Sequence, residues 1–212
     1  MEVLRHSDAD GCARRAAALM ADPDIVHLGL AGGSTPLRAY ELLGGLRSDW
    51  SGVHLWFGDE RCVPEGDEEA NHHMASKVLD APGATWHRIH GELGPDEAAA
   101  AYATQLGSTV LDLVLLGMGE DGHTASLFPG NPALDDDGIA VGVRGAPKPP
   151  PERVSLTLDC LNASRRIVLL TAGEGKREAL ARVLAGPDPD VPASLLERSR
   201  LTVVADAAAL GD

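Results

Sequence analysis

The sequence predicts an α/β fold with a doubly wound, mostly parallel, Rossmann-like sheet flanked by helices. Two observations favour this class. Short apolar runs alternate with helical patterns along the whole chain, which is typical of strands joined by crossover helices. Several runs also end in glycine-rich turns with polar residues, as the carboxyl ends of parallel strands do. The length of 212 residues and the absence of an internal repeat indicate one domain over residues 1–212.

The first half of the chain contains three apolar runs and three helical patterns. We expect strands at residues 3–5, 25–30 and 53–57, and helices ending at residue 21, spanning 37–46 and lying within 67–79. Asp8 or Asp10 is expected to cap the first helix, because aspartate accepts hydrogen bonds from the free amides at a helix start. Pro23 then ends that helix, since proline cannot continue it.

The second half continues the same alternation. Ile89 marks a weak strand, and Pro95 suits the first position of a helix because no amide donor is needed there. The segment 154–156 is expected to rejoin the main sheet. The complete expectation is a helix at 95–106, strands at 111–116, 139–143, 154–156, 166–171 and 201–204, a helix from 176 to 184 and a short helix at 192–197.

Composition excludes several classes of partner. The net charge of −14 argues against nucleic acid or an anionic membrane surface. An anionic substrate must therefore be held by a local group of cations. No N-terminal apolar segment and no run of 18 apolar residues is present, so we expect a soluble cytoplasmic protein, with a monomer compatible with the sequence.

The cysteines give no sign of a disulfide framework or a zinc site. Cys12, Cys62 and Cys160 are odd in number and form no CxxC pair. Adjacent His72 and His73 point in different directions on a helix, which disfavours a joint metal site. We therefore expect free thiols, no metal and no cofactor.

The strongest functional signal follows the predicted strand at 111–116. Gly117-Met118-Gly119-Glu120-Asp121-Gly122-His123 is a glycine-rich turn that places Asp121 and His123 at the end of a central strand. A histidine in a loop is commonly an ordinary surface residue. The position at a strand end favours a site instead, and an acid two residues away is able to orient the imidazole.

A second glycine turn follows the predicted strand at 25–30. Gly32-Gly33-Ser34-Thr35-Pro36 leads into a helix, and amides and hydroxyls at a helix start bind anions well. The alternative is a plain helix cap by Ser34 or Thr35 with Pro36 at the first helical position.

Basic residues occupy two further loops. Arg61 follows Asp59 and Glu60 after the strand at 53–57, and a guanidinium grips a phosphate with two parallel hydrogen bonds. Lys148 and Arg153 lie in a proline-rich segment that is either a linker or a stiffened binding loop. The charged stretch from Asp59 to Arg61 is also compatible with a solvated turn. Asn71 is able to cap a helix or reach the site. Lys176 is expected on a helix surface, and a position that faces the ligand is the alternative.

Four of these stretches together resemble the 6-phosphogluconolactonase family. They are Gly32-Gly33-Ser34-Thr35-Pro36, Asp59-Glu60-Arg61-Cys62-Val63-Pro64, the segment from Gly119 to Pro129, and Lys148-Pro149-Pro150 with Arg153. Asn71-His72-His73-Met74-Ala75 and Lys176 are weaker matches. The chain is shorter than many members, and His72 stands where an aromatic residue is common. The resemblance implies the fold type of glucosamine-6-phosphate deaminase and ribose-5-phosphate isomerase, no metal, and hydrolysis of 6-phospho-D-glucono-1,5-lactone in the oxidative pentose phosphate pathway.

Lactone hydrolysis needs a base, an oriented water and donors for the oxyanion. His123 is the expected base, oriented by Asp121 or Asp59, and the amides of residues 117–122 are candidate oxyanion donors. The expected phosphate contacts are Gly33, Ser34, Thr35, Arg61, Lys148 and Arg153.

Two other functions remain open at this point. A sugar-phosphate isomerase or deaminase is the nearest alternative, but its Phe-Asn-Glu-Pro pattern has no counterpart in Ser126-Leu127-Phe128-Pro129, which contains no acid. A catalytically silent sugar-phosphate sensor on the same fold is the other. The presence of His123 and Asp121 and the lack of a basic DNA-binding stretch disfavour it.

Overall fold

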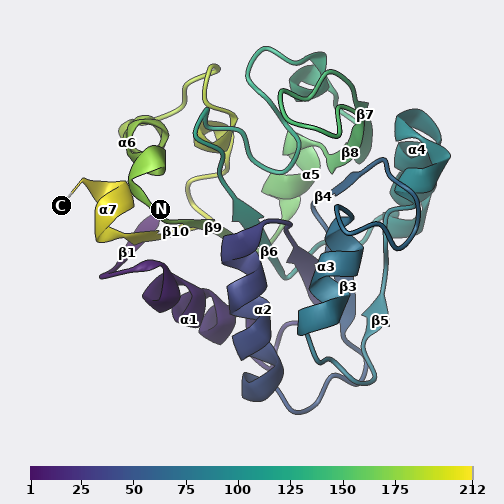
Figure 1. Cartoon of the computed structure of the whole chain (residues 1–212), viewed down its shortest axis with the longest axis horizontal. Coiled ribbons are helices and arrows are strands. Elements are labelled where there is room, and N and C mark those ends of the chain that lie inside the picture. The colour runs from purple at the N-terminus through teal and green to yellow at the C-terminus, as the bar shows by residue number, and fades with distance from the viewer. Residues whose placement is uncertain (212) are drawn as a thin grey trace.

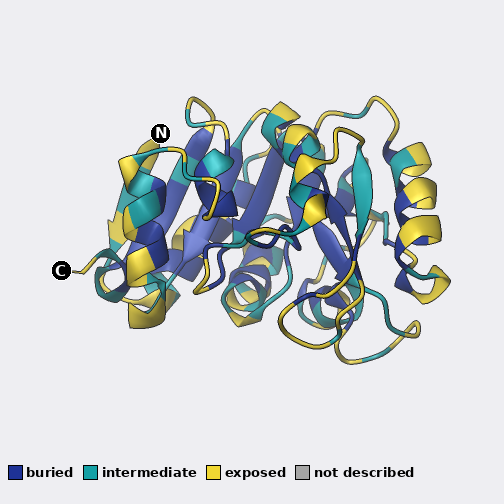
Figure 2. Cartoon of the chain, turned by 90° about the horizontal axis from the view of Figure 1, so that it is seen from above, coloured by how far each residue is buried: buried dark blue, intermediate teal, exposed yellow. Residues whose placement is uncertain are grey.

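The computed structural model describes residues 1–211, and its centre is a seven-stranded sheet in which every adjacent pair of strands runs parallel (Figure 1). Helices cover both faces of this sheet (Figures 1 and 2). The predicted fold class is therefore confirmed. In spatial order the strands are β1 (Glu2–His6), β10 (Leu201–Asp206), β9 (Ile167–Thr171), β6 (Leu113–Gly117), β2 (His27–Leu30), β3 (His54–Phe57) and β5 (Thr85–Trp86).

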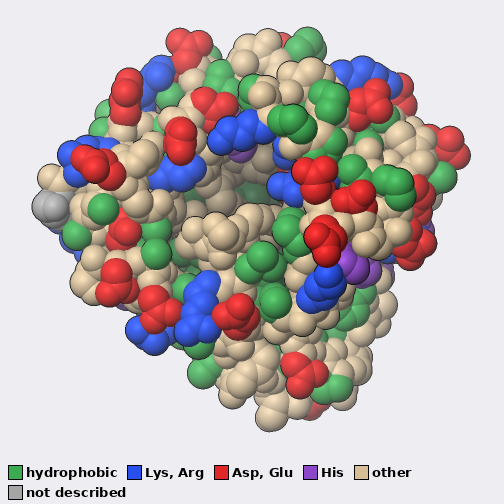
Figure 3. Space-filling model, viewed as in Figure 1, with side chains coloured by type: hydrophobic (Ala, Val, Ile, Leu, Met, Phe, Trp, Pro, Cys, Tyr) green, Lys and Arg blue, Asp and Glu red, His purple; other side chains and the backbone are tan. Residues whose placement is uncertain are grey.

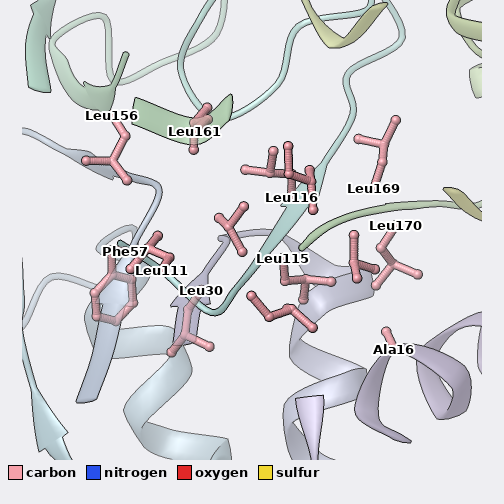
Figure 4. Packing of buried hydrophobic residues seen from close by; sticks show 14 of the residues in the cluster. Ala16, Leu30, Phe57, Leu111, Leu115, Leu116, Leu156, Leu161, Leu169 and Leu170 are labelled. Atoms are coloured by element: carbon pink, nitrogen blue, oxygen red, sulfur yellow. The ribbon is translucent and has the colours of Figure 1, made fainter. Parts of the chain in front are cut away.

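The central strands are apolar along their length because both of their faces are buried (Figure 2). Leu115 and Leu116 on β6 pack among Leu169, Leu170 and Leu30 from the neighbouring strands (Figure 4). Burial of one such side chain is worth about 1.5–3 kcal/mol. The buried apolar side chains form one cluster that includes residues of β2, β3, β6, β9 and β10, which supports the proposal of a single domain.

Seven α-helices lie within residues 1–211. Asp8, rather than Asp10, caps the first of them, since its side chain accepts a hydrogen bond of 2.8 Å from the amide of Gly11. The last helix and the fifth are short and were not predicted. None of the helices in this part of the chain is long and apolar enough to span a membrane. The helices are α1 (Ala9–Met20), α2 (Ser34–Leu46), α3 (Asn71–Val78), α4 (Pro95–Leu106), α5 (Leu158–Ala163), α6 (Arg177–Ala185) and α7 (Ala207–Leu210).

A second sheet of three antiparallel strands corrects one prediction and rules out one alternative. It consists of β4 (Asp59–Arg61), β8 (Arg153–Leu156) and β7 (Ala140–Val143), with β8 in the middle. Residues 154–156 therefore do not rejoin the main sheet, and residues 59–61 form a strand rather than a turn. The chain changes sheets at Gly58, whose amide bonds the carbonyl of Leu30 and whose carbonyl accepts from the amide of Leu156.

Smaller differences concern short elements. The strand expected at Ile89 is found at β5, and Ile89 is buried just outside it. Residues expected as a short helix at 192–197 form the 3₁₀ turn Pro192–Leu195. The other 3₁₀ turns are Gly91–Leu93, Pro132–Asp135 and Glu174–Lys176.

The order of the strands fixes where a ligand is able to bind. From β2 the chain moves outward to β3 and β5, and from β6 it moves outward to β9 and β10 on the other side. The connections that leave the carboxyl ends of β2 and β6 therefore lead to opposite edges of the sheet, and such a switch point opens a crevice in a parallel sheet.

Candidate active site

A cavity of about 430 Å³ opens at the carboxyl ends of β2, β6 and β9. Figure 3 shows it as a hollow near the centre of the face, with blue lysine and arginine side chains beside it. The structure brings together all the predicted site residues except Asp121 along this cavity. Those that line it are Gly33, Ser34, Thr35, Asp59, Arg61, His123, Lys148 and Arg153.

Asp121 contacts the cavity only through His123. Its Oδ1 lies 2.5 Å from Nδ1 of His123 and 3.2 Å from the His123 amide. A carboxylate only accepts hydrogen bonds, so Nδ1 must carry the proton and Nε2 is left as an acceptor. The Asp121 side chain is 41% exposed and that of His123 only 22%. The pair therefore presents one basic nitrogen from a largely enclosed ring.

The turn between β6 and His123 requires glycine at two positions. A Cβ at Gly119 would lie 2.2 Å from the His123 ring, so only glycine lets the imidazole pack there. Gly122 has φ of 82°, and a Cβ there would lie 2.6 Å from Val191. The amide of Gly119 donates to the carbonyl of His123, and the amide of Gly122 to that of Gly119. These two amides are thus already used, and the expectation that the turn supplies oxyanion donors remains a prediction for its other amides.

The surroundings of His123 keep it neutral. Burial lowers its pKa, while the neighbouring Asp121 raises it by a smaller amount, so the net direction is downward. The ring of Phe128 lies 4.6 Å from the imidazole, centroid to centroid. Phe128 was not singled out from the sequence, although it lies in the segment from Gly119 to Pro129 that resembles the family. A neutral imidazole near pH 7 is the form that accepts a proton.

Asp59 is bound differently and does not occupy the position beside Nδ1. Its Oδ2 accepts a hydrogen bond of 2.6 Å from Ser126, and its Oδ1 one of 3.2 Å from the side-chain amide of Asn71. The Asp59 side chain is buried on the cavity wall. Of the two carboxylates considered for orienting the imidazole, Asp121 is the one that the geometry favours.

The start of α2 faces the cavity without a side-chain cap. The helix begins at Ser34 after Gly33, whose φ of 101° favours glycine, so the alternative of a cap by Ser34 or Thr35 is wrong. The first intrahelical donor is the amide of Leu37, and the amides before it lie at the positive end of the helix. Tyr40 fixes this turn through two hydrogen bonds to Ala31.

Arg61 and Arg153 line the cavity from the second sheet. Arg153 is 7% exposed, and its Nε and Nη2 donate to the carbonyls of Pro150 and Lys148, which holds the proline-rich loop in place. Arg61 donates from Nη1 to the carbonyl of Glu69, and its buried Nε has no hydrogen-bond partner within residues 1–211. A buried, unpartnered cationic N–H beside a cavity is a suitable donor for an anion.

Lys176 was expected on a helix surface, and this expectation is wrong. It ends the 3₁₀ turn after β9 and lines the cavity. Burial lowers the pKa of Lys176, and nearby Lys148 acts in the same direction. Lys176 comes shortly after the buried central strand β9. A position after such a strand is the same sequence signal that identified Ser34, Asp59 and His123.

No group of three or more His, Cys, Asp or Glu side chains in the described part of the chain is arranged to hold a metal ion. The three cysteines are free thiols.

Comparisons with known proteins agree with this fold. Residues 1–205 match the family model described as glucosamine-6-phosphate isomerases/6-phosphogluconolactonase. A 6-phosphogluconolactonase of Streptomyces coelicolor is 43% identical over 158 residues, which cover 65% of this chain and 60% of that protein. The crystal structure of a 6-phosphogluconolactonase from Shewanella baltica superposes with a TM-score of 0.87 at 26% identity, covering 98% of both chains. A monomeric glucosamine-6-phosphate deaminase superposes equally well, with a TM-score of 0.87 at 25% identity over 100% of this chain and 99% of that one.

Proposed function

The chain belongs to the glucosamine-6-phosphate isomerase/6-phosphogluconolactonase family, and from that premise we propose that it hydrolyses 6-phospho-D-glucono-1,5-lactone to 6-phospho-D-gluconate. The observation that carries the proposal is the His123–Asp121 pair at a cavity lined by four cationic side chains. The relatives of Streptomyces and Shewanella bear the name of this activity. These features support a substrate that carries an anionic phosphate and, away from it, an uncharged acyl group.

In the proposed reaction His123 is the general base. Its Nε2 takes a proton from a water as the water oxygen forms a bond to C1 of the lactone. The bond between C1 and the ring oxygen then breaks, and protonated His123 returns its proton to that oxygen. The products are a free hydroxyl and a carboxylic acid, which ionises at neutral pH. Asp121 stabilises the imidazolium between the two steps and keeps the ring oriented.

The 6-phosphate is proposed to bind among the cations. Arg61, Lys148 and Arg153 supply charge, with Lys176 as a fourth cation on the same cavity. Gly33, Ser34 and Thr35 add the amides and hydroxyls at the start of α2. Binding of the phosphate away from C1 positions the carbonyl for attack, which is how remote contacts accelerate a reaction.

The direct test is a lactonase assay with freshly generated 6-phosphogluconolactone, measured against its spontaneous hydrolysis. The protein should accelerate the hydrolysis in proportion to its concentration. Hydrolysis at the spontaneous rate would reject the proposal.

A deaminase or isomerase is the second candidate, since the monomeric deaminase has the same fold at a TM-score of 0.87. The segment from Ser126 to Pro129 supplies no carboxylate for opening a sugar ring. We therefore expect no conversion of glucosamine 6-phosphate. Conversion of that compound, with no effect on the lactone, would favour the second candidate.

Location and partners are proposed from charge and thiol content. Free cysteines and a net charge of −14 support a cytoplasmic protein that does not bind nucleic acid. We further propose that it acts without metal or cofactor, and as a monomer.

A further inference from the structure

Glu60 is a buried carboxylate next to the site that the proposed mechanism does not use. It is 2% exposed and lies on β4 between Asp59 and Arg61. Burial raises its pKa to about 7, although the amides that it bonds act in the opposite direction. Retaining such a group in the interior is costly, and the contacts of its two oxygens show what it does.

The carboxylate of Glu60 binds backbone amides of two separate segments. Oε1 accepts from the amide of Arg61 at 2.7 Å and from that of Asn71 at 2.6 Å, and Oε2 accepts from the amide of His72 at 2.8 Å. Asn71 and His72 are the first residues of α3, whose own N-cap residue, Ala70, makes no side-chain bond. Glu60, which lies on β4, thus caps the start of α3, and its negative charge lies at the positive end of that helix.

The first residue of α3 is in turn part of the cavity wall. Asn71 is 1% exposed, and its side-chain amide donates to the backbone carbonyl of Asp59 at 2.9 Å and to its Oδ1 at 3.2 Å. On its other side, Asn71 packs so close to Gly32 that a Cβ there would lie 1.9 Å from its Oδ1. Asn71 therefore fills the space between β4 and the glycine turn that precedes α2.

These contacts connect Glu60 to both halves of the site. On the phosphate side, Glu60 holds the backbone of Arg61, and Arg61 bonds the carbonyl of Glu69 just before α3. On the catalytic side, Asp59 accepts from Ser126, which follows His123 in the same loop. A shift at the start of α3 is thus transmitted to the cavity wall, both beside Arg61 on the phosphate side and beside Asp59 on the catalytic side.

We propose that Glu60 is a positioning residue: its buried carboxylate fixes the start of α3 against β4, and thereby places Asn71, Asp59 and Arg61 around the substrate. The inference rests on the proposed lactonase function for its kinetic consequence, but its structural part is measurable without any substrate.

Glu60→Gln is the direct test, because glutamine keeps the shape but turns one oxygen into an NH₂ group that faces a backbone N–H. Glu68→Gln is the matched control: it removes the same charge from the same segment, and its side chain is 91% exposed. Glu60→Asp keeps the charge on a side chain shorter by one methylene. Hydrogen exchange at the amides of Asn71 and His72 should accelerate in Glu60→Gln, less so in Glu60→Asp, and not in Glu68→Gln.

The kinetic readout separates positioning from a loss of folded protein. Misplacement of reacting groups costs up to about 100-fold in rate, so kcat/KM for 6-phosphogluconolactone should fall about 10- to 100-fold in Glu60→Gln. KM should rise together with the fall in kcat, because Arg61 moves as well. Glu60→Asp should lie between this variant and the wild type. A smaller folded fraction alone would lower kcat and leave KM unchanged.

Three results would overturn the proposal. One is unchanged exchange at Asn71 and His72 in Glu60→Gln. Another is a kcat lowered with KM unchanged. The third is failure of both Glu60 variants to fold, which would make Glu60 a folding determinant. If the wild type does not hydrolyse the lactone, the proposed function fails, and the exchange experiment alone then decides whether Glu60 holds α3.

Discussion

Arg61 on β4 and Arg153 on β8 are directly opposite each other in the antiparallel pairing of the small sheet. Like charges at such positions repel, and Arg61 indeed contributes to the lowered pKa of Arg153, after the larger effect of burial. Both line the cavity. An anion bound between them would relieve the repulsion, so the pair is well suited to a phosphate even in a chain of net charge −14.

The first prediction concerns this pair. Arg61→Ala should weaken binding of 6-phosphogluconate by ~1.5–3 kcal/mol, the worth of a hydrogen bond to a charged group. Lys148→Ala should have a similar effect. Arg61→Lys should recover only part of the loss, because a lysine cannot form two parallel hydrogen bonds. Titration calorimetry with 6-phosphogluconate measures each value.

Arg14→Ala is the control, since Arg14 lies on α1 with its side chain 64% exposed and pairs with Asp10. It removes the same charge without touching the cavity and should leave binding unchanged. The Arg61 variant should also lose far more activity on phosphorylated than on unphosphorylated gluconolactone. Equal losses on both substrates would show that Arg61 does not bind the phosphate.

How far the sequence predicts this site depends on where each residue lies. Ser34, Asp59 and His123 each follow a strand of one parallel sheet, so their convergence was predictable from strand ends alone. The pairing of Arg61 with Arg153 was not, because β4 is short, charged and indistinguishable from a turn in sequence, and its partner lies far along the chain. The long-range register depends on packing rather than on local pattern.

The choice between two carboxylates likewise needed the structure. Spacing made Asp121 a candidate partner of His123, and proximity to a strand end made Asp59 another. Only the hydrogen bonds from Ser126 and Asn71 show that Asp59 is directed elsewhere. The short helices α5 and α7 were missed because one turn carries too few residues for a periodic pattern.

The second prediction concerns the base. His123→Gln should lower kcat by ~10²–10⁴-fold, the usual contribution of a positioned general base. Because the pKa of His123 is lowered by burial, activity should persist somewhat below the ordinary histidine value of ~6.5. It should then fall as the pH drops further and the imidazole becomes protonated. A pH–rate profile of kcat/KM measures this decline in activity toward low pH.

His90→Gln serves as the control, because His90 is 45% exposed and contacts Glu92 rather than the cavity. It should retain full activity. An unchanged kcat in a folded His123→Gln protein would remove His123 from the mechanism.

The third prediction is that chelation leaves the activity intact. The described residues offer no cluster of side chains able to hold a metal ion, and His123 with Asp121 supplies the base without one. Lactonase rates measured before and after exhaustive dialysis against EDTA should agree. Loss of activity that one divalent ion restores would contradict the proposed mechanism.

Acid stability is the subject of the last prediction. It concerns three histidines: His27 and His54, the first residues of β2 and β3, and His87, which directly follows β5. The rings of His27, His54 and His87 form a stack, and Nδ1 of His54 lies 2.8 Å from Nε2 of His87. One of these two nitrogens must be unprotonated to accept the bond. Trp56 donates to His27 at 3.1 Å and stacks on His87 with ring centroids 3.8 Å apart.

Burial lowers the pKa of both His27 and His87, and the neighbouring His54 lowers each further, while Asp112 opposes this at His27. A lowered pKa means that the unfolded chain binds more protons, so the stability from these groups is complete above the unfolded value of ~6.5 and declines as the pH falls below it. We therefore expect these histidines to lower the free energy of unfolding in urea between pH 7.5 and 5.5, while Glu60, whose pKa is raised by burial, acts in the opposite direction over this range in every variant. The fall should be smaller in His87→Gln, since the amide can still bond His54 without binding a proton.

His73→Gln, on α3 outside the stack, should keep the wild-type dependence. The same fall in His87→Gln as in the wild type would show that the stack does not govern acid stability.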